Sequence, residues 1–329
     1  MDADLPADLR RGLAGLVERQ SRHELAARAS AFSQLYRSGG RSADAIRDAT
    51  DALAYAVARL PATYAAAVGA LAALAQARPE FSPATLLDVG AGPGTAAWAA
   101  TRIFPAIGHI RLIDDNRHLR ELARALAASG PGVLHGATYE SGELTAQLRD
   151  APRAELVIAS YVIGELAADK LARCADALWS AAADALIVIE PGTTAGFSRV
   201  RDLRAQLIAC GAHVVAPCPH DAACPIVAPD WCHFAQRLAR SRDHRRVKGA
   251  TLAFEDEKFS YVALARDAPR PPSFAARVLA HPRVTKGTAS AKLCTPEGIT
   301  TATAARRARD SYRLIKGWRW GDAVTRAAE

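Results

Sequence analysis

The sequence predicts an α/β fold built on a doubly wound, mostly parallel sheet. Two observations carry this prediction. From residue 85 onward, short apolar runs alternate with amphipathic segments of helix length, which is the order of elements in such a sheet. The first run, residues 86–89, leads directly into a loop that contains Gly90, Gly92 and Gly94. Glycines at alternate positions allow backbone angles closed to other residues and let a ligand approach the main chain, so this loop is expected to hold a nucleotide-like cofactor.

The other elements of this domain follow along the chain. Their periodicity and flanking turn residues set the expected bounds. Helices are expected at residues 96–103, 119–128 and 170–182, and strands at 86–89, 110–113, 132–135, 156–160 and 186–189. A final hairpin, with strands 250–254 and 259–265 around a charged turn at 255–258, would give the sheet an antiparallel edge.

A helical region is expected before this domain, over residues 1–78. Apolar residues such as Leu9 and Leu13 recur there at helical spacing. The glycine pair at 39–40 should break this region once, and Pro61 should cause a kink or a helix restart.

The domain organisation follows from shifts in composition. The α/β domain is expected over residues 79–268, interrupted by a proline- and cysteine-rich insertion at 210–245. A cluster of prolines then opens a small, basic, β-rich C-terminal domain, residues 269–329. Its strand-like segments lie around 278–286 and 291–303.

Length and composition indicate a globular protein of more than one domain. The chain has 329 residues, of which 50% are hydrophobic and 23% charged, and no apolar run is expected to reach the length of a membrane span. The N-terminal order Met-Asp-Ala-Asp-Leu-Pro lacks the basic-then-apolar pattern of a secretion signal and is too acidic for a transit peptide. We therefore expect a cytoplasmic protein without a membrane partner. In a reducing compartment its six cysteines are better candidates for metal ligation or core packing than for disulfides.

The net charge of +8 is concentrated near the C-terminus. Residues 231–329 contain 20 Lys and Arg against 9 Asp and Glu, whereas residues 1–230 contain 22 against 25. This asymmetry predicts a polyanionic partner, with nucleic acid as the first candidate class. A basic surface that is merely solvated is the alternative.

The glycine spacing separates two cofactor classes. A dinucleotide fold prefers G-x-G-x-x-G, but this chain has G-x-G-x-G, with Asp88 two places before the first glycine. The pattern resembles the first motif of class I S-adenosylmethionine-dependent methyltransferases. A site for NAD is the alternative.

The methyltransferase resemblance implies roles for further residues. Asp114, the first acid after the second strand, would accept hydrogen bonds from both ribose hydroxyls, with the adjacent Asp115 as second candidate. Asp88 would orient the loop and contact the methionine ammonium, unless it only caps the turn. Ser160, at the end of the fourth strand, is a further candidate for cofactor binding.

No catalytic set can be assigned from the sequence. The fourth strand is not followed by the Asn/Asp-Pro-Pro-Tyr/Phe set of amine methylation, and no cysteine nucleophile lies near the expected site. Ser160, Tyr161 and Glu190 lie at carboxyl ends of strands, where ligands bind in open sheets, but none has an evident general-base partner. Cofactor contact or turn structure is therefore the favoured interpretation of all three.

The insertion contains a candidate metal site. Cys218, Cys224 and Cys232 are separated by five and then seven residues within a proline-rich loop, and Cys294 of the C-terminal domain is the candidate for a fourth ligand. Four thiolates suit tetrahedral zinc or an iron-sulfur cluster, and the spacing does not separate the two.

The remaining cysteines and nearby histidines have simpler interpretations. His220 and His233 are reserve ligands, although a supporting or surface role is favoured for each. Cys174 lies in an expected helix and Cys210 at a helix end before Gly211, and both are interpreted as core residues.

Together these motifs resemble a known family, the methyltransferase-like proteins of the mitochondrial small ribosomal subunit and their bacterial relatives (the methyltransferase-like protein 17 family). The likeness covers roughly residues 55–322. The motifs that carry it are Asp88-Val-Gly-Ala-Gly-Pro-Gly94, Glu190-Pro-Gly192, Cys218-Pro-His-Asp-x-x-Cys224-Pro, Asp230-Trp-Cys-His-Phe234, Cys294-Thr-Pro-Glu-Gly298 and the ending Gly317-Trp-Arg-Trp-Gly-Asp322.

The resemblance implies cofactors, partners and a function. The four cysteines would hold a four-iron, four-sulfur (4Fe-4S) cluster, the glycine loop would bind S-adenosylmethionine, and the protein would bind ribosomal RNA (rRNA) during assembly of the small ribosomal subunit. A catalytically active rRNA methyltransferase, working by proximity and orientation, is the alternative.

A basic surface in the C-terminal domain would contact the RNA. Phosphate contacts should dominate its affinity. Trp318 and Trp320 would stack on unpaired bases or pack into the core of the tail. The expected basic residues are Lys286, Lys292, Arg306, Arg307, Arg309, Lys316 and Arg319.

Overall fold

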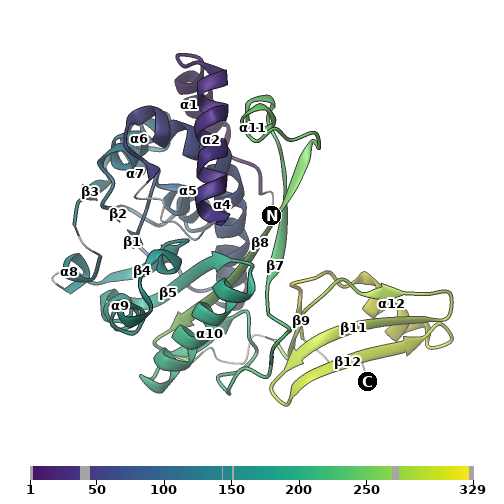
Figure 1. Ribbon diagram of the computed structural model, residues 1–329. Helices are drawn as coiled ribbons and strands as arrows, with labels where there is room; N and C mark the ends of the chain where they lie inside the picture. Colours follow the sequence, from purple (N-terminus) through teal and green to yellow (C-terminus); the bar gives the residue numbers. More distant parts are fainter. Residues whose placement is uncertain (1–2, 38–44, 143, 150–151, 269–273, 326–329) are drawn as a thin grey trace.

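The computed structural model describes residues 3–37, 45–142, 144–149, 152–268 and 274–325 (Figure 1). The predicted break at residues 39–40 and the proline cluster that opens the C-terminal domain lie outside these ranges.

The centre of the molecule is an eight-stranded mixed sheet. The order along the sheet is β3-β2-β1-β4-β5-β8-β6, and β7 also pairs with β8. The first five strands are parallel, whereas β8 runs antiparallel to β5, β6 and β7. This arrangement, with its antiparallel edge, is the Rossmann-like α/β fold of class I methyltransferases. The strands are β1 (Thr85–Val89), β2 (His109–Ile113), β3 (Thr138–Glu140), β4 (Ala154–Ser160), β5 (Ala182–Pro191), β6 (His213–Ala216), β7 (Phe234–Ala239) and β8 (Phe254–Ala265).

Helices cover both faces of this sheet. Successive strand residues point to opposite faces, so Leu86 packs in one hydrophobic cluster with residues of α4 and α5 while Leu87 packs in another with residues of α9 and α10. The helices are α1 (Ala7–Val17), α2 (Arg22–Arg37), α4 (Ala49–Ala77), α5 (Thr95–Ile103), α6 (Arg117–Ala127), α7 (Gly132–His135), α8 (Leu144–Arg149), α9 (Ala168–Ala181), α10 (Thr194–Ala209), α11 (Arg242–Val247) and α12 (Arg309–Gly317).

The long helix α4 is a core element. Its N-terminus is capped by Asp48, whose side chain accepts a hydrogen bond from the Asp51 N–H. Of the kink or restart predicted at Pro61, the restart is wrong, because one helix continues through this residue to Ala77. The sequence analysis expected no apolar run of membrane-spanning length, but α4 is long and apolar enough to cross a membrane by length and composition. Of its apolar stretch, 78% is buried within the fold.

The third strand of the sheet was misplaced by the sequence prediction. Residues 132–135, expected as a strand, form the short helix α7, and the strand itself follows at Thr138–Glu140. Pro131 precedes the helix, and proline favours helix starts because its fixed φ and missing N–H cost nothing there.

The predicted hairpin at residues 250–265 is also wrong. The charged run 255–258 is not a turn but lies inside the long strand β8, paired with β7. The structure explains why a strand tolerates this run, because each acid meets a cation from another segment. The ion pairs are Arg240 with Glu255, Arg237 with Asp256 and Arg59 with Glu257.

The C-terminal residues form a second sheet with its own hydrophobic core, placed beside the end of β7 (Figure 1). Helix α12, which was not predicted, packs on this sheet through the buried Ile315. The strands are β9 (Ala276–Val278), β10 (Arg283–Val284), β11 (Thr288–Thr295), β12 (Gly298–Ala305) and β13 (Ala323–Val324).

Candidate functional site

The glycine loop connects β1 to α5 at the carboxyl edge of the parallel strands. Gly90, Gly92 and Gly94 all have positive φ, at 66°, 55° and 77°, a region that glycine adopts without strain. The N–H groups of Gly90 and Ala91 donate to the Ile113 carbonyl, which fixes the loop against the end of β2. The loop therefore lies between the ends of β1 and β2, where open α/β sheets bind ligands.

Asp88 lies beneath this loop and is only 1% exposed. Its Oδ2 accepts a 3.1 Å hydrogen bond from the Ala97 N–H in the first turn of α5, whereas Oδ1 has no partner among the described residues. Burial raises the pKa of this carboxyl to about 7. The contact with Ala97 holds the helix against the loop.

Asp114, directly after β2, reaches the same loop. Its Oδ2 accepts a 2.7 Å hydrogen bond from the Gly92 N–H, and its Oδ1 accepts one from the Asn116 N–H at 2.8 Å. Burial raises the pKa of Asp114. Asp115, the second candidate, is exposed. Asp114 is thus the acid of the pair that contacts the glycine loop.

Ser160 ends β4, one residue before an unusual backbone conformation. Tyr161 has φ of 58°, the left-handed region that residues with a side chain rarely adopt. Its hydroxyl donates to Glu257 Oε1 at 2.9 Å, and the same carboxylate oxygen is paired with Arg59 at 3.2 Å. This buried set, which the sequence did not reveal, joins the end of β4 to β8 and α4.

Glu190 lies near the carboxyl end of β5 and is buried. Its Oε1 accepts a hydrogen bond from the Gly164 N–H at 3.2 Å, and its Oε2 lies 3.9 Å from Arg199. A Cβ on Gly164 would come within 2.6 Å of the carboxylate, so a larger residue there would require Glu190 to shift. Burial raises the pKa of Glu190 to about 7. These contacts give Glu190 a clear role in shaping the segment after β4.

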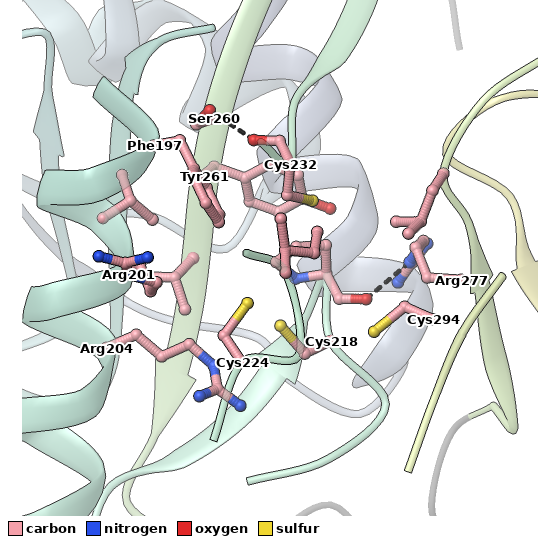
Figure 2. A pocket seen from close by; sticks show the side chains of 15 residues that line it. Phe197, Arg201, Arg204, Cys218, Cys224, Cys232, Ser260, Tyr261, Arg277 and Cys294 are labelled. Atoms are coloured by element: carbon pink, nitrogen blue, oxygen red, sulfur yellow. Dashed lines mark hydrogen bonds between the residues drawn. The ribbon is translucent and has the colours of Figure 1, made fainter. Parts of the chain in front are cut away.

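The four candidate metal ligands lie around one cavity. Cys218, Cys224, Cys232 and Cys294 all line it, although the last is 62 residues distant from the third in sequence (Figure 2). The cavity volume is about 40 Å³, room for about three water molecules.

The described residues contain no preformed site for a single metal ion. Among the described residues, no group of three or more His, Cys, Asp or Glu side chains is close enough together to hold one metal ion. A tetrahedral zinc site needs sulfur atoms about 2.3 Å from one centre.

The environment of the thiols is apolar. Burial raises the pKa of Cys218, and burial with the other three cysteines holds the pKa of Cys232 well above its ordinary value. For Cys294, burial and its neighbours raise the pKa to about 12. Cysteine ligates metals as thiolate, so binding here would release protons.

Hydrogen bonds and ion pairs join the insertion to the rest of the protein. Ser260 of β8 donates to the Cys232 carbonyl at 2.7 Å, and the Trp231 indole donates to the Gly192 carbonyl at 3.0 Å. Asp230 forms an ion pair with Lys292 of β11. The cysteine loop therefore contacts both sheets.

The structure places the two reserve histidines and the two remaining cysteines in different environments. His220 Nε2 lies 3.7 Å from Cys294 Sγ, whereas His233 stacks on the Trp231 ring. Cys174 is buried in the core, but Cys210 is exposed. The prediction of a core position for Cys210 is wrong because the residue caps the C-terminus of α10.

Two arginines at the cavity were missed by the sequence analysis. Arg204 and Arg277 both line it and are almost fully buried. A signal was available for each. Arg277 is a lone charge in the apolar strand β9, and Arg204 lies next to Leu203 and one turn before Leu207 on the inner side of α10.

The predicted basic residues gather on the C-terminal sheet and α12. All are exposed except Lys292, which is half-buried and paired with Asp230. Arg313, which was not predicted, shares one exposed stripe of α12 with Arg309 and Lys316 at helical spacing. Trp318 is half-buried against the C-terminal core, and Trp320 packs against the main core with its indole N–H without a partner among the described residues.

Curated relatives are mitochondrial proteins. The human ribosome assembly protein METTL17, mitochondrial, is 31% identical over 295 residues, covering 83% of this chain and 62% of that protein. The Rsm22-cox11 tandem protein 2, mitochondrial, of Schizosaccharomyces pombe is 28% identical over 274 residues, covering 73% of this chain and 35% of that protein. The chain thus spans less than two thirds of the length of these relatives.

Solved structures show only a distant likeness. The magnesium protoporphyrin IX methyltransferase of Synechocystis PCC 6803 is 13% identical, with a TM-score of 0.41 over 63% of this chain and 84% of that one. A likeness of this size adds nothing to the fold read from the strand order.

The relatives correct the expected location and establish the family. The cytoplasmic expectation is wrong, because the names of the matched relatives point to the mitochondrion; the composition of the first residues did not carry this information. A sequence model described as "Mitochondrial small ribosomal subunit Rsm22" matches residues 49–325. The chain therefore belongs to the Rsm22 family.

Proposed function

We propose that this protein acts in assembly of the small ribosomal subunit. In this role it binds S-adenosylmethionine at the glycine loop, carries a 4Fe-4S cluster on its four clustered cysteines, and holds rRNA on its basic C-terminal unit. The observation that carries the proposal is the cysteine cavity, because its ligands come from both the insertion and the C-terminal sheet. A group bound there would fix the basic unit to the α/β domain.

The proposal for S-adenosylmethionine rests on the loop geometry. Gly90, Gly92 and Gly94 leave the backbone open to a nucleoside, and Asp114 lies beside them as an acceptor for ribose hydroxyls. Asp88 places negative charge beneath the loop, which suits a cationic ligand. Ser160 would line the same edge of the sheet from the end of β4.

The proposal for a cluster rests on the donor set and the cavity that it lines. Soft thiolate ligands select iron-sulfur clusters or zinc. The void of about 40 Å³ that the four cysteines line is where such a group would lie. Cys218, Cys224, Cys232 and Cys294 would hold it, and zinc is the alternative.

The proposal for RNA rests on exposed charge. Six of the seven predicted basic residues are exposed on the C-terminal unit, and Arg313 extends them along α12. The name of the human relative describes a ribosome assembly protein, which agrees with a partner of this charge.

Metal analysis combined with a visible spectrum tests the cluster. Protein purified without oxygen should be brown and contain about four iron atoms per chain, the composition of a 4Fe-4S cluster. The variant Cys224→Ser should be colourless, and Cys210→Ser, which changes an exposed cysteine outside the cavity, should stay brown. Colourless wild-type protein with one zinc per chain would overturn the cluster assignment.

Transfer of a labelled methyl group decides between an assembly factor and an active rRNA methyltransferase. The substrates are small-subunit rRNA, naked and in assembly intermediates, with labelled S-adenosylmethionine. Binding of the cofactor without transfer supports the assembly role. Transfer to one nucleotide would establish the enzyme instead.

A further inference from the structure

Two buried arginines lie at the wall of the cysteine cavity. Arg277 on β9 is 3% exposed and Arg204 on α10 is 4% exposed. In Figure 2 they lie on either side of the sulfur atoms of Cys218, Cys224 and Cys294. Each comes from a different part of the fold, so their meeting at this cavity depends on the tertiary structure.

Neither arginine has a carboxylate partner among the described residues. Arg277 donates through Nε to the Pro217 carbonyl and through Nη1 to the Gly321 carbonyl, both at 2.8 Å. Arg204 donates through Nη2 to the carbonyls of His220 and Ala222, at 2.7 and 2.9 Å. Its buried Nε has no hydrogen-bond partner in the part of the chain that the structure describes. Carbonyl groups satisfy N–H donors but do not neutralise a cation.

Two uncompensated cations in an apolar cavity are costly. A buried charge is tolerated when an opposite charge lies close to it. The four cysteines that line the same cavity are the groups placed to supply that charge, and a neutral thiol does not supply it. They supply it only as metal-bound thiolates.

The charges of the occupied site match those of the arginines. Four thiolates around a divalent zinc carry a net charge of −2, and four thiolates around an oxidised 4Fe-4S core of charge +2 also carry −2. Arg204 and Arg277 together carry +2. Counting these two buried arginines, the cavity with its bound group is neutral, whereas the cavity with four thiols has an excess of two positive charges. Arg201 also lines the cavity, but it is partly exposed and paired with Asp202.

We propose that Arg204 and Arg277 are the charge partners of the metal-thiolate group, and that they make retention of this group and its reduction more favourable. The inference rests on the metal site of the proposed function. Reduction of a cluster adds one negative charge, and a nearby cation stabilises the more negative state. Removal of either arginine should thus weaken retention and lower the reduction potential.

The test uses the full chain purified without oxygen. Arg277→Met and Arg204→Met remove one charge each while keeping an apolar side chain of similar length, and Arg277→Lys keeps the charge. Arg266→Met is the matched control, because Arg266 also donates to backbone carbonyls, those of Trp179 and Ala182, but does not line the cavity.

Three measurements are made on each variant. The first is the rate of metal loss to a chelator, the second is the midpoint potential of the cluster, and the third is the melting temperature with and without metal. In both charge-removing variants we expect metal loss to be at least tenfold faster. We also expect at least a tenfold shift of the redox equilibrium, 59 mV toward lower potential for one electron. Arg277→Lys should retain most of the wild-type behaviour, and Arg266→Met all of it.

The outcomes distinguish this inference from the proposed metal site on which it rests. Wild-type protein that carries no metal overturns both. Metal-bearing wild-type protein whose Met variants lose metal no faster than Arg266→Met overturns the inference alone. If Arg277→Met and Arg277→Lys both lower the melting temperature by the same amount with and without metal, Arg277 has a packing role. This result would also overturn the inference.

Discussion

The backbone N–H of Gly92 donates a 2.7 Å hydrogen bond to Asp114 Oδ2. This contact ties the middle of the glycine loop to the end of β2. The other oxygen of Asp114 accepts the Asn116 N–H, so each oxygen already has one backbone donor. A carboxylate offers about four acceptor positions, and the two that remain are available to a pair of ribose hydroxyls.

We expect Asp114→Asn to weaken binding of S-adenosylmethionine by roughly 10- to 100-fold. The amide loses the charge and one acceptor oxygen, and hydrogen bonds to charged groups contribute about 1.5–3 kcal/mol. Isothermal titration of the cofactor measures this change. Asp115→Asn is the control, because Asp115 is the adjacent acid and is exposed. A larger loss in Asp115→Asn than in Asp114→Asn would reverse the assignment.

Two glycines of the loop should differ in their tolerance of alanine. Both have positive φ, which costs an L-residue about 1–2 kcal/mol. At Gly92 a Cβ would meet open space, but at Gly90 it would lie 2.3 Å from Val162 Cγ2. Gly90→Ala should therefore lower the free energy of unfolding by clearly more than Gly92→Ala, as measured by urea denaturation. Equal losses of unfolding free energy in the two variants would mean that Val162 moves away from the new Cβ without loss of stability.

The glycine loop, the parallel strands and the cluster of cysteines were predictable because their signals are local. Residues 86–94 carry a strand, three glycines and an acid within one short segment. Three of the cysteines were predictable as a set because they share one loop, whereas Cys294 was named as the candidate for a fourth ligand and the family resemblance implied all four together. The structure places Cys294 at the same cavity.

The errors arose where tertiary contacts override a local pattern. Residues 255–258 have the composition of a turn, but cross-strand arginines neutralise their acids within a strand. The burial of charged residues was also hard to predict. Arginines are usually solvated, and the burial of Arg204 and Arg277 at the cavity depends on the folded structure. The position of Tyr161 at the end of a strand was predictable but its contacts were not, because its partners Arg59 and Glu257 are about 100 residues away in each direction.

The buried Asp88 should make stability depend on pH. Its pKa is about 7 in the folded protein, against about 3.9 in an unfolded chain. Between these values the folded state binds more protons than the unfolded state, so the free energy of unfolding falls as pH rises from about 4 to 7. One such group contributes a slope of up to about 1.4 kcal/mol per pH unit. Glu190, whose pKa is also about 7, adds to the same trend.

The variant Asp88→Asn should flatten this dependence. Asparagine keeps an acceptor for the Ala97 N–H but does not ionise. Urea denaturation at pH 5, 6, 7 and 8 should give a shallower decline than in the wild type, with Asp115→Asn as a control that leaves the decline unchanged. A variant that declines as steeply as the wild type would show that Asp88 is already ionised at pH 5.

The exposed stripe of α12 should contribute to RNA binding through phosphate contacts. Each neutralised phosphate adds about 0.7–0.9 to the slope of log affinity against log salt. Replacing Arg309, Arg313 and Lys316 with alanine should therefore reduce the slope by about 2 to 3, measured with small-subunit rRNA by filter binding between 50 and 200 mM salt. The control replaces Arg10, Arg19 and Arg117, three exposed arginines outside the C-terminal unit, and changes the net charge equally. If both triple variants lose the same slope, the RNA senses only the overall charge and the stripe has no special role.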